Sequence, residues 1–228
     1  MHDEESRPVD FAEAGVIWDM DGVLVDTGEF HYRSWRATLA TVGLDYTREQ
    51  FRRCFGLNND ETLARLDLAG LPVQERDRIK ASKEESFRAS VRGHARPLPG
   101  VHAWLEKLRS WGLAQAIASS APPANIDVLI DELALRGFFD AVVGGDDLPG
   151  KPDPAIFVEA ARRIGRNPAR CVVIEDSVAG VSGAKDAGMR CIAITNTNPA
   201  RELTRADLVV ESLDRVSPGV VAMLLDAR

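Results

Sequence analysis

From residue 96 onward, short apolar runs alternate with longer segments of helical periodicity. The apolar runs lie at residues 114–118, 141–143, 171–174, 191–194 and 208–210. Segments with helical spacing occupy residues 100–111, 123–136, 154–165 and 177–187. Strands that alternate with helices indicate βαβ units and a mostly parallel sheet with helices on both faces. A further apolar run at residues 16–18 has no other partner, so we expect it to join this sheet in an α/β fold.

The segment between the first apolar run and residue 94 has a different character. Its apolar residues, such as Phe30, Trp35 and Leu39, recur at near-helical spacing, and no strand-like run interrupts them. We expect an all-helical cap at residues 29–96, inserted into a core formed by residues 14–28 and 97–228. The chain would cross between the two near residues 27–29 and 94–99, and residues 1–13 form a polar N-terminal tail.

The composition excludes several classes of function. The 228 residues carry a formal net charge of -7 and 45% hydrophobic residues, which is typical of a soluble globular protein. An acidic chain argues against nucleic-acid or anionic-membrane binding, because both partners require a basic face. The start of the chain lacks the apolar core of a signal peptide. Three widely spaced cysteines, Cys54, Cys171 and Cys191, indicate reduced thiols, so we expect a cytoplasmic protein. We also expect a monomer or a weak homodimer.

Two acidic residues, Asp19 and Asp21, follow the first apolar run. Residues i and i+2 of an extended segment lie on the same face, so their carboxylates would share one small volume. Their repulsion requires a cation or a shared proton, which suits Mg²⁺ binding or covalent and acid–base catalysis. The alternative is a capped turn, because Asp is common in turns and Gly22 permits a sharp one.

Other polar residues follow the later strands. Ligands bind beyond the carboxyl ends of the strands in an open parallel sheet. Ser119 and Ser120 follow one strand and suit phosphate binding, although a turn or capping serine has the same signature. Lys151 lies between prolines that would aim its ammonium group, with a solvated loop lysine as the alternative. Glu175 and Asp176 end a buried strand, where a metal would compensate their charge, although Asp176 could also cap the next helix.

Taken together, these motifs closely resemble the haloacid dehalogenase-like superfamily, in the branch of β-phosphoglucomutase and small-metabolite phosphatases. The resemblance covers residues 14–228. It is carried by DMDGVLVDT at residues 19–27, by Ser119 after a strand, by KPDP at residues 151–154 and by EDSVAG at residues 175–180. The resemblance implies a Rossmann-like core with an inserted helical cap, in agreement with the periodicity.

The resemblance also implies roles for individual residues. Asp19 is similar to the nucleophile that forms an aspartyl-phosphate, and Asp21 to the general acid and base. Ser119, with its neighbour Ser120, and Lys151 resemble the phosphate-binding residues. The Mg²⁺ ligands implied are Asp19, the Asp21 carbonyl, Asp176 and Glu175, the last directly or through water.

The phosphoryl acceptor is the open question. His31 and Lys83 resemble residues of β-phosphoglucomutase that couple cap closure to catalysis and contact the distal phosphate. Asn59, however, stands where the mutase pattern has an arginine, and an amide cannot grip a second phosphate as a guanidinium does. Pro122 and Pro123 likewise replace a Lys-Asn pair of the mutase pattern.

We therefore predict an Mg²⁺-dependent phosphatase of a small phosphorylated metabolite, most simply a sugar phosphate. The first alternative is a β-phosphoglucomutase-type phosphotransferase. A non-catalytic binding protein on the same fold is the third hypothesis. Loss of Asp19 or Lys151 would be its signature, and both residues are present.

Overall fold

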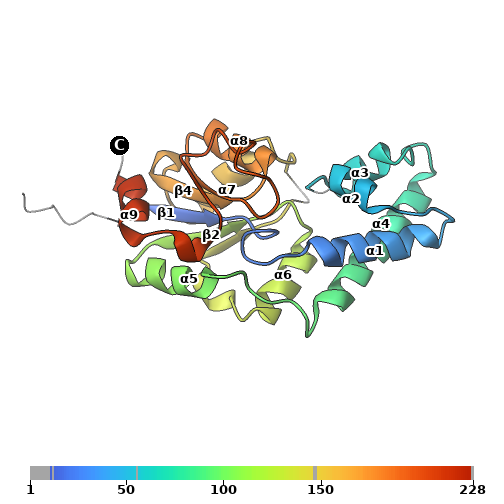
Figure 1. Cartoon of the computed structure of the whole chain (residues 1–228), viewed down its shortest axis with the longest axis horizontal. Coiled ribbons are helices and arrows are strands. Elements are labelled where there is room, and N and C mark those ends of the chain that lie inside the picture. Colours follow the sequence, from blue (N-terminus) through green and yellow to red (C-terminus); the bar gives the residue numbers. More distant parts are fainter. Residues whose placement is uncertain (1–10, 12, 55, 146–147, 227–228) are drawn as a thin grey trace, which may run out of the picture.

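The computed structural model describes residues 11, 13–54, 56–145 and 148–226, so most of the predicted tail lies outside the described residues (Figure 1). Six strands form one sheet in the order β3-β2-β1-β4-β5-β6, and every described strand pair is parallel. The strands are β1 (Gly15–Trp18), β2 (Ala114–Ala118), β3 (Ala141–Val143), β4 (Cys171–Glu175), β5 (Arg190–Ile194) and β6 (Leu208–Val210). The predicted α/β class is confirmed, and each predicted strand matches within one residue.

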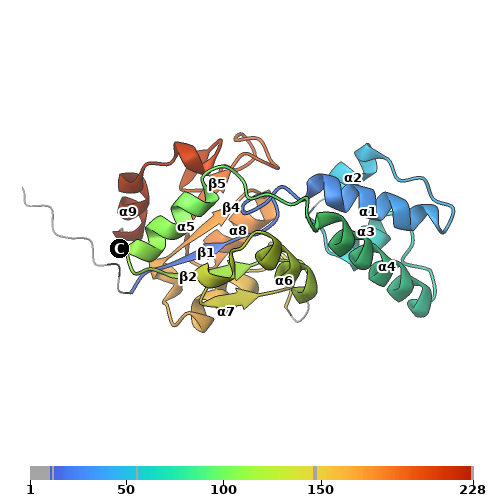
Figure 2. The ribbon, with the colours of Figure 1, turned by 90° about the horizontal axis from the view of Figure 1, so that it is seen from below.

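Helices cover both faces of the sheet, as Figures 1 and 2 show. Helices α5 (Val101–Ser110), α6 (Pro123–Glu132) and α9 (Pro218–Asp226) pack on one face, and α7 (Ala155–Arg163) and α8 (Val178–Asp186) pack on the other. The alternation of side chains along β1 assigns Trp18 to the first cluster and Ile17 to the second. The sheet therefore separates two hydrophobic clusters, and its strands are apolar on both sides.

Two predicted helix ends need correction. Helix α6 ends at Glu132, short of the predicted residue 136, because the chain leaves the helix through Ala134, whose φ is 55°. Helix α7 begins at Ala155, so Pro154 is its N-cap position and not its first residue. Asp153 still satisfies the helix start, because its Oδ1 accepts a hydrogen bond from the Ala155 N–H. Short 3₁₀ segments lie at Arg136–Phe138, Pro168–Arg170 and Leu213–Arg215.

Helices α1 (Gly28–Ala40), α2 (Arg48–Cys54), α3 (Asn59–Arg65) and α4 (Val73–Val91) lie together at one end of the sheet (Figure 1). They enclose a third hydrophobic cluster that includes Trp35, Tyr46 and Leu63. The last turns of α4 also pack on the core, because Phe87 and Val91 belong to a hydrophobic cluster of the sheet. In the described parts of the chain, no helix is long and apolar enough to cross a lipid bilayer.

The two chain crossings lie side by side. Val25 forms an antiparallel bridge with Pro97, and the Leu98 N–H donates to the Leu24 carbonyl at 3.0 Å. Gly22 allows the preceding turn, since its φ is 84° and its N–H donates to the Val25 carbonyl. The first crossing thus places the residues after β1 next to the entrance of the helical unit.

Candidate active site

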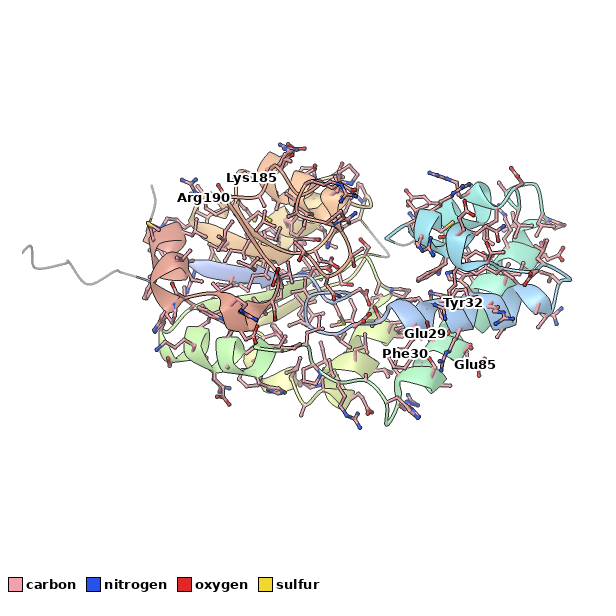
Figure 3. All side chains as sticks on the ribbon, in the orientation of Figure 1. Glu29, Phe30, Tyr32, Glu85, Lys185 and Arg190 are labelled. Carbon is pink, nitrogen blue, oxygen red and sulfur yellow. The ribbon has the colours of Figure 1, made fainter. Side chains whose placement is uncertain are left out.

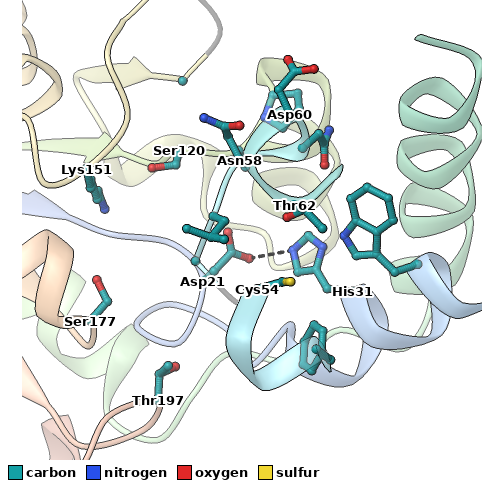
Figure 4. Close-up of a pocket in the computed structure, with 18 of the residues that line it drawn as sticks. Asp21, His31, Cys54, Asn58, Asp60, Thr62, Ser120, Lys151, Ser177 and Thr197 are labelled. Carbon is teal, nitrogen blue, oxygen red and sulfur yellow. Dashed lines mark ion pairs between the residues drawn. The ribbon is translucent and has the colours of Figure 1, made fainter. Parts of the chain in front are cut away.

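A cleft of about 450 Å³ lies between the carboxyl ends of the strands and helices α1–α4. Most of the predicted site residues line it, and four of them, Asp21, His31, Ser120 and Lys151, are labelled in Figure 4. The predicted residues in its lining are Asp19, Asp21, His31, Asn59, Lys83, Ser120, Lys151, Glu175 and Asp176. Residues that are distant in the sequence meet here because parallel strands end at the same edge of a sheet. The Asp19 N–H extends the ladder beyond β1 by donating to the Ile174 carbonyl at 2.9 Å.

Lys151 lies between two carboxylates that line the cleft. Its Nζ is 2.5 Å from Asp19 Oδ1 and 2.6 Å from Glu175 Oε1, and its side chain is only 7% exposed. Burial disfavours its ammonium ion, but the two carboxylates outweigh this effect and raise the pKa of Lys151. The solvated-loop alternative for this lysine is therefore wrong.

Asp19 occupies a position of conflicting charges. Burial raises its pKa to about 7; Lys151 opposes this shift, whereas the nearby charges of Glu175 and Asp21 reinforce it. Additional positive charge at this point would favour the carboxylate form, which is the form that can attack phosphorus.

The Glu175 carboxylate is fully engaged with the protein. Its Oε1 accepts from Lys151, and its Oε2 accepts from the N–H groups of Asp176 and Ser177 and from the Ser177 hydroxyl. Gly180 leaves room for it, because a Cβ at that position would overlap the carboxylate. Glu175 thus holds Lys151 and the start of α8 in place, and its predicted role as a metal ligand stays a prediction.

Three carboxylates, those of Asp19, Glu175 and Asp176, offer oxygens that lie within 4.8 Å of one another. Asp176 Oδ2 is buried and has no hydrogen-bond partner among the described residues. Burial raises the pKa of Asp176 to about 9, and the nearby charges of Glu175 and Asp19 contribute to this shift. An unpartnered buried carboxylate oxygen in an acidic cluster fits a hard divalent cation such as Mg²⁺. The capping alternative for Asp176 is wrong, because the Ser177 hydroxyl accepts from the Gly180 N–H and caps α8.

Asp21 has different partners from Asp19. Its Oδ1 accepts a hydrogen bond from the Thr27 hydroxyl and lies 3.6 Å from His31 Nε2 (Figure 4). Burial opposes its ionisation, but His31 and Thr27 outweigh this and hold the pKa of Asp21 below its usual value. The His31 ring also stacks on Phe87, with a centroid separation of 4.1 Å. His31 therefore links Asp21 to α4, and its predicted role in coupling cap closure to catalysis stays a prediction.

The two adjacent serines have separate environments. Ser119 is fully buried, and its hydroxyl accepts from the Ala121 N–H, which is the turn-serine arrangement. Ser120 is half-buried and lines the cleft. Successive side chains at a strand end point in opposite directions, so only one of the two can face a ligand. The structure brings Ser120, and not Ser119, to the cleft.

Helices α3 and α4 contribute the remaining predicted residues, Asn59 and Lys83. Both bind Glu84, a residue that sequence reasoning missed: its Oε1 accepts from Asn59 Nδ2 at 2.7 Å and from Lys83 Nζ at 2.8 Å. Adjacent helical positions do not normally face each other, so the sequence held no signal for this pair. Thr197, which follows β5 and also lines the cleft, was missed as well. Its position beyond a strand end was the available signal.

The comparisons with known proteins agree with this geometry. Residues 16–194 match the haloacid dehalogenase-like hydrolase family, and the chain belongs to that family. It is 32% identical to the phosphorylated carbohydrates phosphatase of Thermotoga maritima, over 85% of this chain and 91% of that protein. It is also 32% identical to the β-phosphoglucomutase of Bacillus subtilis, over 86% and 88%.

Solved structures of related proteins have the same fold as this chain. The structure of CbbY from Rhodobacter sphaeroides with xylulose 1,5-bisphosphate superposes with a TM-score of 0.81 and 29% identity, over 90% of this chain and 96% of that one. Some relatives are longer: the chain spans 55% of a phosphatase of Arabidopsis thaliana to which it is 31% identical.

Proposed function

We propose that this protein is an Mg²⁺-dependent phosphatase that hydrolyses a small sugar phosphate through an aspartyl-phosphate. The observation that carries the proposal is the division of labour between two carboxylates in one cleft. Asp19 lies against Lys151 beside the acidic cluster, whereas Asp21 lies against His31 and Thr27. Distinct environments are the mark of carboxylates with distinct catalytic roles.

In the first step, an Asp19 oxygen attacks phosphorus and the bond to the leaving oxygen breaks. Asp21 gives its proton to the leaving oxygen, so the alcohol departs neutral. The pKa of Asp21 is lowered in the free protein, so this step requires it to take up a proton first. A bound phosphate dianion favours that uptake, because a neighbouring negative charge raises the pKa of a carboxyl group.

In the second step, Asp21 takes a proton from water, whose oxygen attacks phosphorus and releases inorganic phosphate from Asp19. Lys151 stays beside Asp19 through both steps and neutralises charge on the transferring group. Asp19, Asp176 and the Asp21 carbonyl would hold Mg²⁺, which supplies positive charge to the phosphoryl oxygens when bound. Ser120 is the serine available to a phosphate oxygen.

A phosphoglucomutase-type phosphotransferase is the second candidate. The contact between His31 and Asp21 favours it, since it links the acid–base residue to the helical unit. Against it, Asn59 is held by Glu84, and a mutase must bind a bisphosphate in both orientations. A non-catalytic role is not supported, because the cleft keeps Asp19, Asp21 and Lys151 together. We further propose a cytoplasmic monomer or weak homodimer; the three cysteines are free and buried.

The test is a phosphate-release screen of purified protein against sugar phosphates and nucleotides, with Mg²⁺ and with EDTA. We expect release from one or a few sugar phosphates, dependence on Mg²⁺, and no release with Asp19→Asn in a protein that circular dichroism shows to be folded. β-Glucose 1-phosphate with a trace of the 1,6-bisphosphate is assayed in parallel for glucose 6-phosphate. Glucose 6-phosphate without matching phosphate release would make the protein a mutase. Retained activity in Asp19→Asn would exclude Asp19 as the nucleophile.

A further inference from the structure

Each lysine of the cleft is paired with acid. Among the described lining residues, the lysines are Lys80, Lys83 and Lys151. Lys151 binds Asp19 and Glu175 at the end where the reacting phosphate must lie. Lys80 lies 3.0 Å from Asp60 and 3.0 Å from Asp77, at the edge of the cleft. Lys83 is the most buried of the three, with its side chain 4% exposed, and it is paired with Glu84.

The position of Lys83 matters for whatever leaves the phosphorus. Lys83 and His31 both contact the Phe87 ring, and His31 contacts Asp21, so the Lys83 ammonium group lies close to the acid–base residue. The leaving group of the proposed reaction must lie next to Asp21, because Asp21 gives it a proton. The Lys83 Nζ also lies 5.5 Å from the ring centroids of Trp35 and Phe87, which fix its direction. An unpaired ammonium ion here would attract a second phosphate on the substrate.

Glu84 is held in place to neutralise that ammonium ion. Its Oε1 accepts from Lys83 Nζ and Asn59 Nδ2, and its Oε2 accepts from Asn125 Nδ2 at 2.5 Å. Asn125 lies on α6, on the sheet side of the cleft, and its own oxygen accepts from Arg88. Burial opposes ionisation, but Lys83 and the two amides keep the pKa of Glu84 below its usual value. Glu84 is therefore a charged group whose orientation is set by three different helices.

From this arrangement we infer that Glu84 is a specificity-determining residue, which neutralises Lys83 and restricts the enzyme to monophosphates with an uncharged, hydroxyl-rich leaving group. The inference rests on the proposed phosphatase function and names its substrate class. A bisphosphate would bring two further negative charges next to the Glu84 carboxylate, with no free cation among the described residues of the cleft to receive them. The Asn58 and Thr62 side chains in the same wall suit neutral hydroxyl groups.

The first test uses the wild-type protein with substrate pairs that differ only in a second phosphate. The pairs are fructose 1-phosphate with fructose 1,6-bisphosphate, and glucose 6-phosphate with glucose 1,6-bisphosphate. We expect kcat/KM for the monophosphate to exceed that for the bisphosphate by about tenfold or more, because the added negative charge meets the Glu84 carboxylate and a lysine that Glu84 already neutralises. Equal or reversed preference would overturn the inference.

The second test changes the charge. We expect Glu84→Gln to reduce the preference for the monophosphate by about tenfold, since it leaves Lys83 without its counter-charge. Glu85, the next residue of α4, is exposed (Figure 3). The matched control is therefore Glu85→Gln, for which we expect the preference for the monophosphate to stay unchanged. A purely structural effect of Glu84→Gln would lower kcat/KM for both members of a pair equally. That result, with an unchanged ratio, would refute the role of Glu84.

A double variant decides whether Glu84 acts through Lys83. In Lys83→Met/Glu84→Gln, the gain for bisphosphates seen in Glu84→Gln should disappear, because the released cation is gone. A gain that persists would contradict the mechanism. The same pairs are also measured by calorimetric binding with Mg²⁺, which does not depend on turnover. Tighter binding of the monophosphate without any hydrolysis would refute the phosphatase function and keep the role of Glu84. Hydrolysis with no preference for the monophosphate would refute the role of Glu84 and keep the phosphatase function. Absence of binding by any pair would refute both.

Discussion

Replacing Gly180 by alanine is a sharp test of how Glu175 is packed. Gly180 lies in the first turn of α8, where its backbone is helical and no left-handed conformation is required. Alanine in a helix interior is normally more stable than glycine by about 1 kcal/mol. A Cβ at Gly180, however, would overlap the Glu175 carboxylate, which is buried behind it. The structure therefore reverses the sign that helix propensity alone predicts.

The magnitude follows from what Glu175 would lose. To make room, its carboxylate must leave Lys151, the N–H groups of Asp176 and Ser177 and the Ser177 hydroxyl. Breaking a buried ion pair costs about 3–5 kcal/mol, and the gain in helix propensity offsets about 1 kcal/mol of that. The net loss of unfolding free energy is therefore about 3 kcal/mol, or roughly 6–12 °C in Tm for a chain of this length.

Urea unfolding at constant m and thermal unfolding both measure this loss. The matched control is Gly219→Ala in α9, where no described atom beyond the neighbouring residues and the helix's own backbone lies within 4 Å of the added Cβ, and where we expect no destabilisation. Because Glu175 positions Lys151, we also expect kcat to fall by about a hundredfold in Gly180→Ala. A Gly180→Ala protein as stable as the wild type, or more stable, would show that the described packing of Glu175 is wrong.

Two further predictions concern single carboxylates. Asp21→Ala should slow both formation and breakdown of the aspartyl-phosphate by about 10² or more, measured by rapid quench, because one group serves both proton transfers; unchanged rates would exclude the acid–base role. Because the pKa of Glu84 is lowered in the folded protein, its contribution to stability is complete above its usual value of 4.5 and is lost as the pH falls. Urea unfolding of the wild type and Glu84→Gln should therefore converge between about pH 5 and pH 3, and a constant difference would argue against the charged pair.

The sequence by itself determined the sheet and the main chemical groups. Strand positions follow from runs such as residues 114–118 and 208–210, whose patterns depend on neighbours one or two residues away. The acids after β1 and β4 lie at strand ends, and parallel strand ends meet at one edge whatever the details of packing. Local periodicity and this topological rule were therefore sufficient to bring Asp19, Asp176 and Lys151 to one site.

Only the tertiary structure decided which neighbouring side chain does what. Ser120 rather than Ser119 lines the cleft, because the Ser119 hydroxyl is turned to the Ala121 N–H inside the fold. Glu84 meets Asn125, 41 residues away, because α4 packs on α6. Such contacts depend on how the helical unit is placed against the sheet to within an ångström or so. No local pattern encodes that placement, because it results from the packing of many side chains at once.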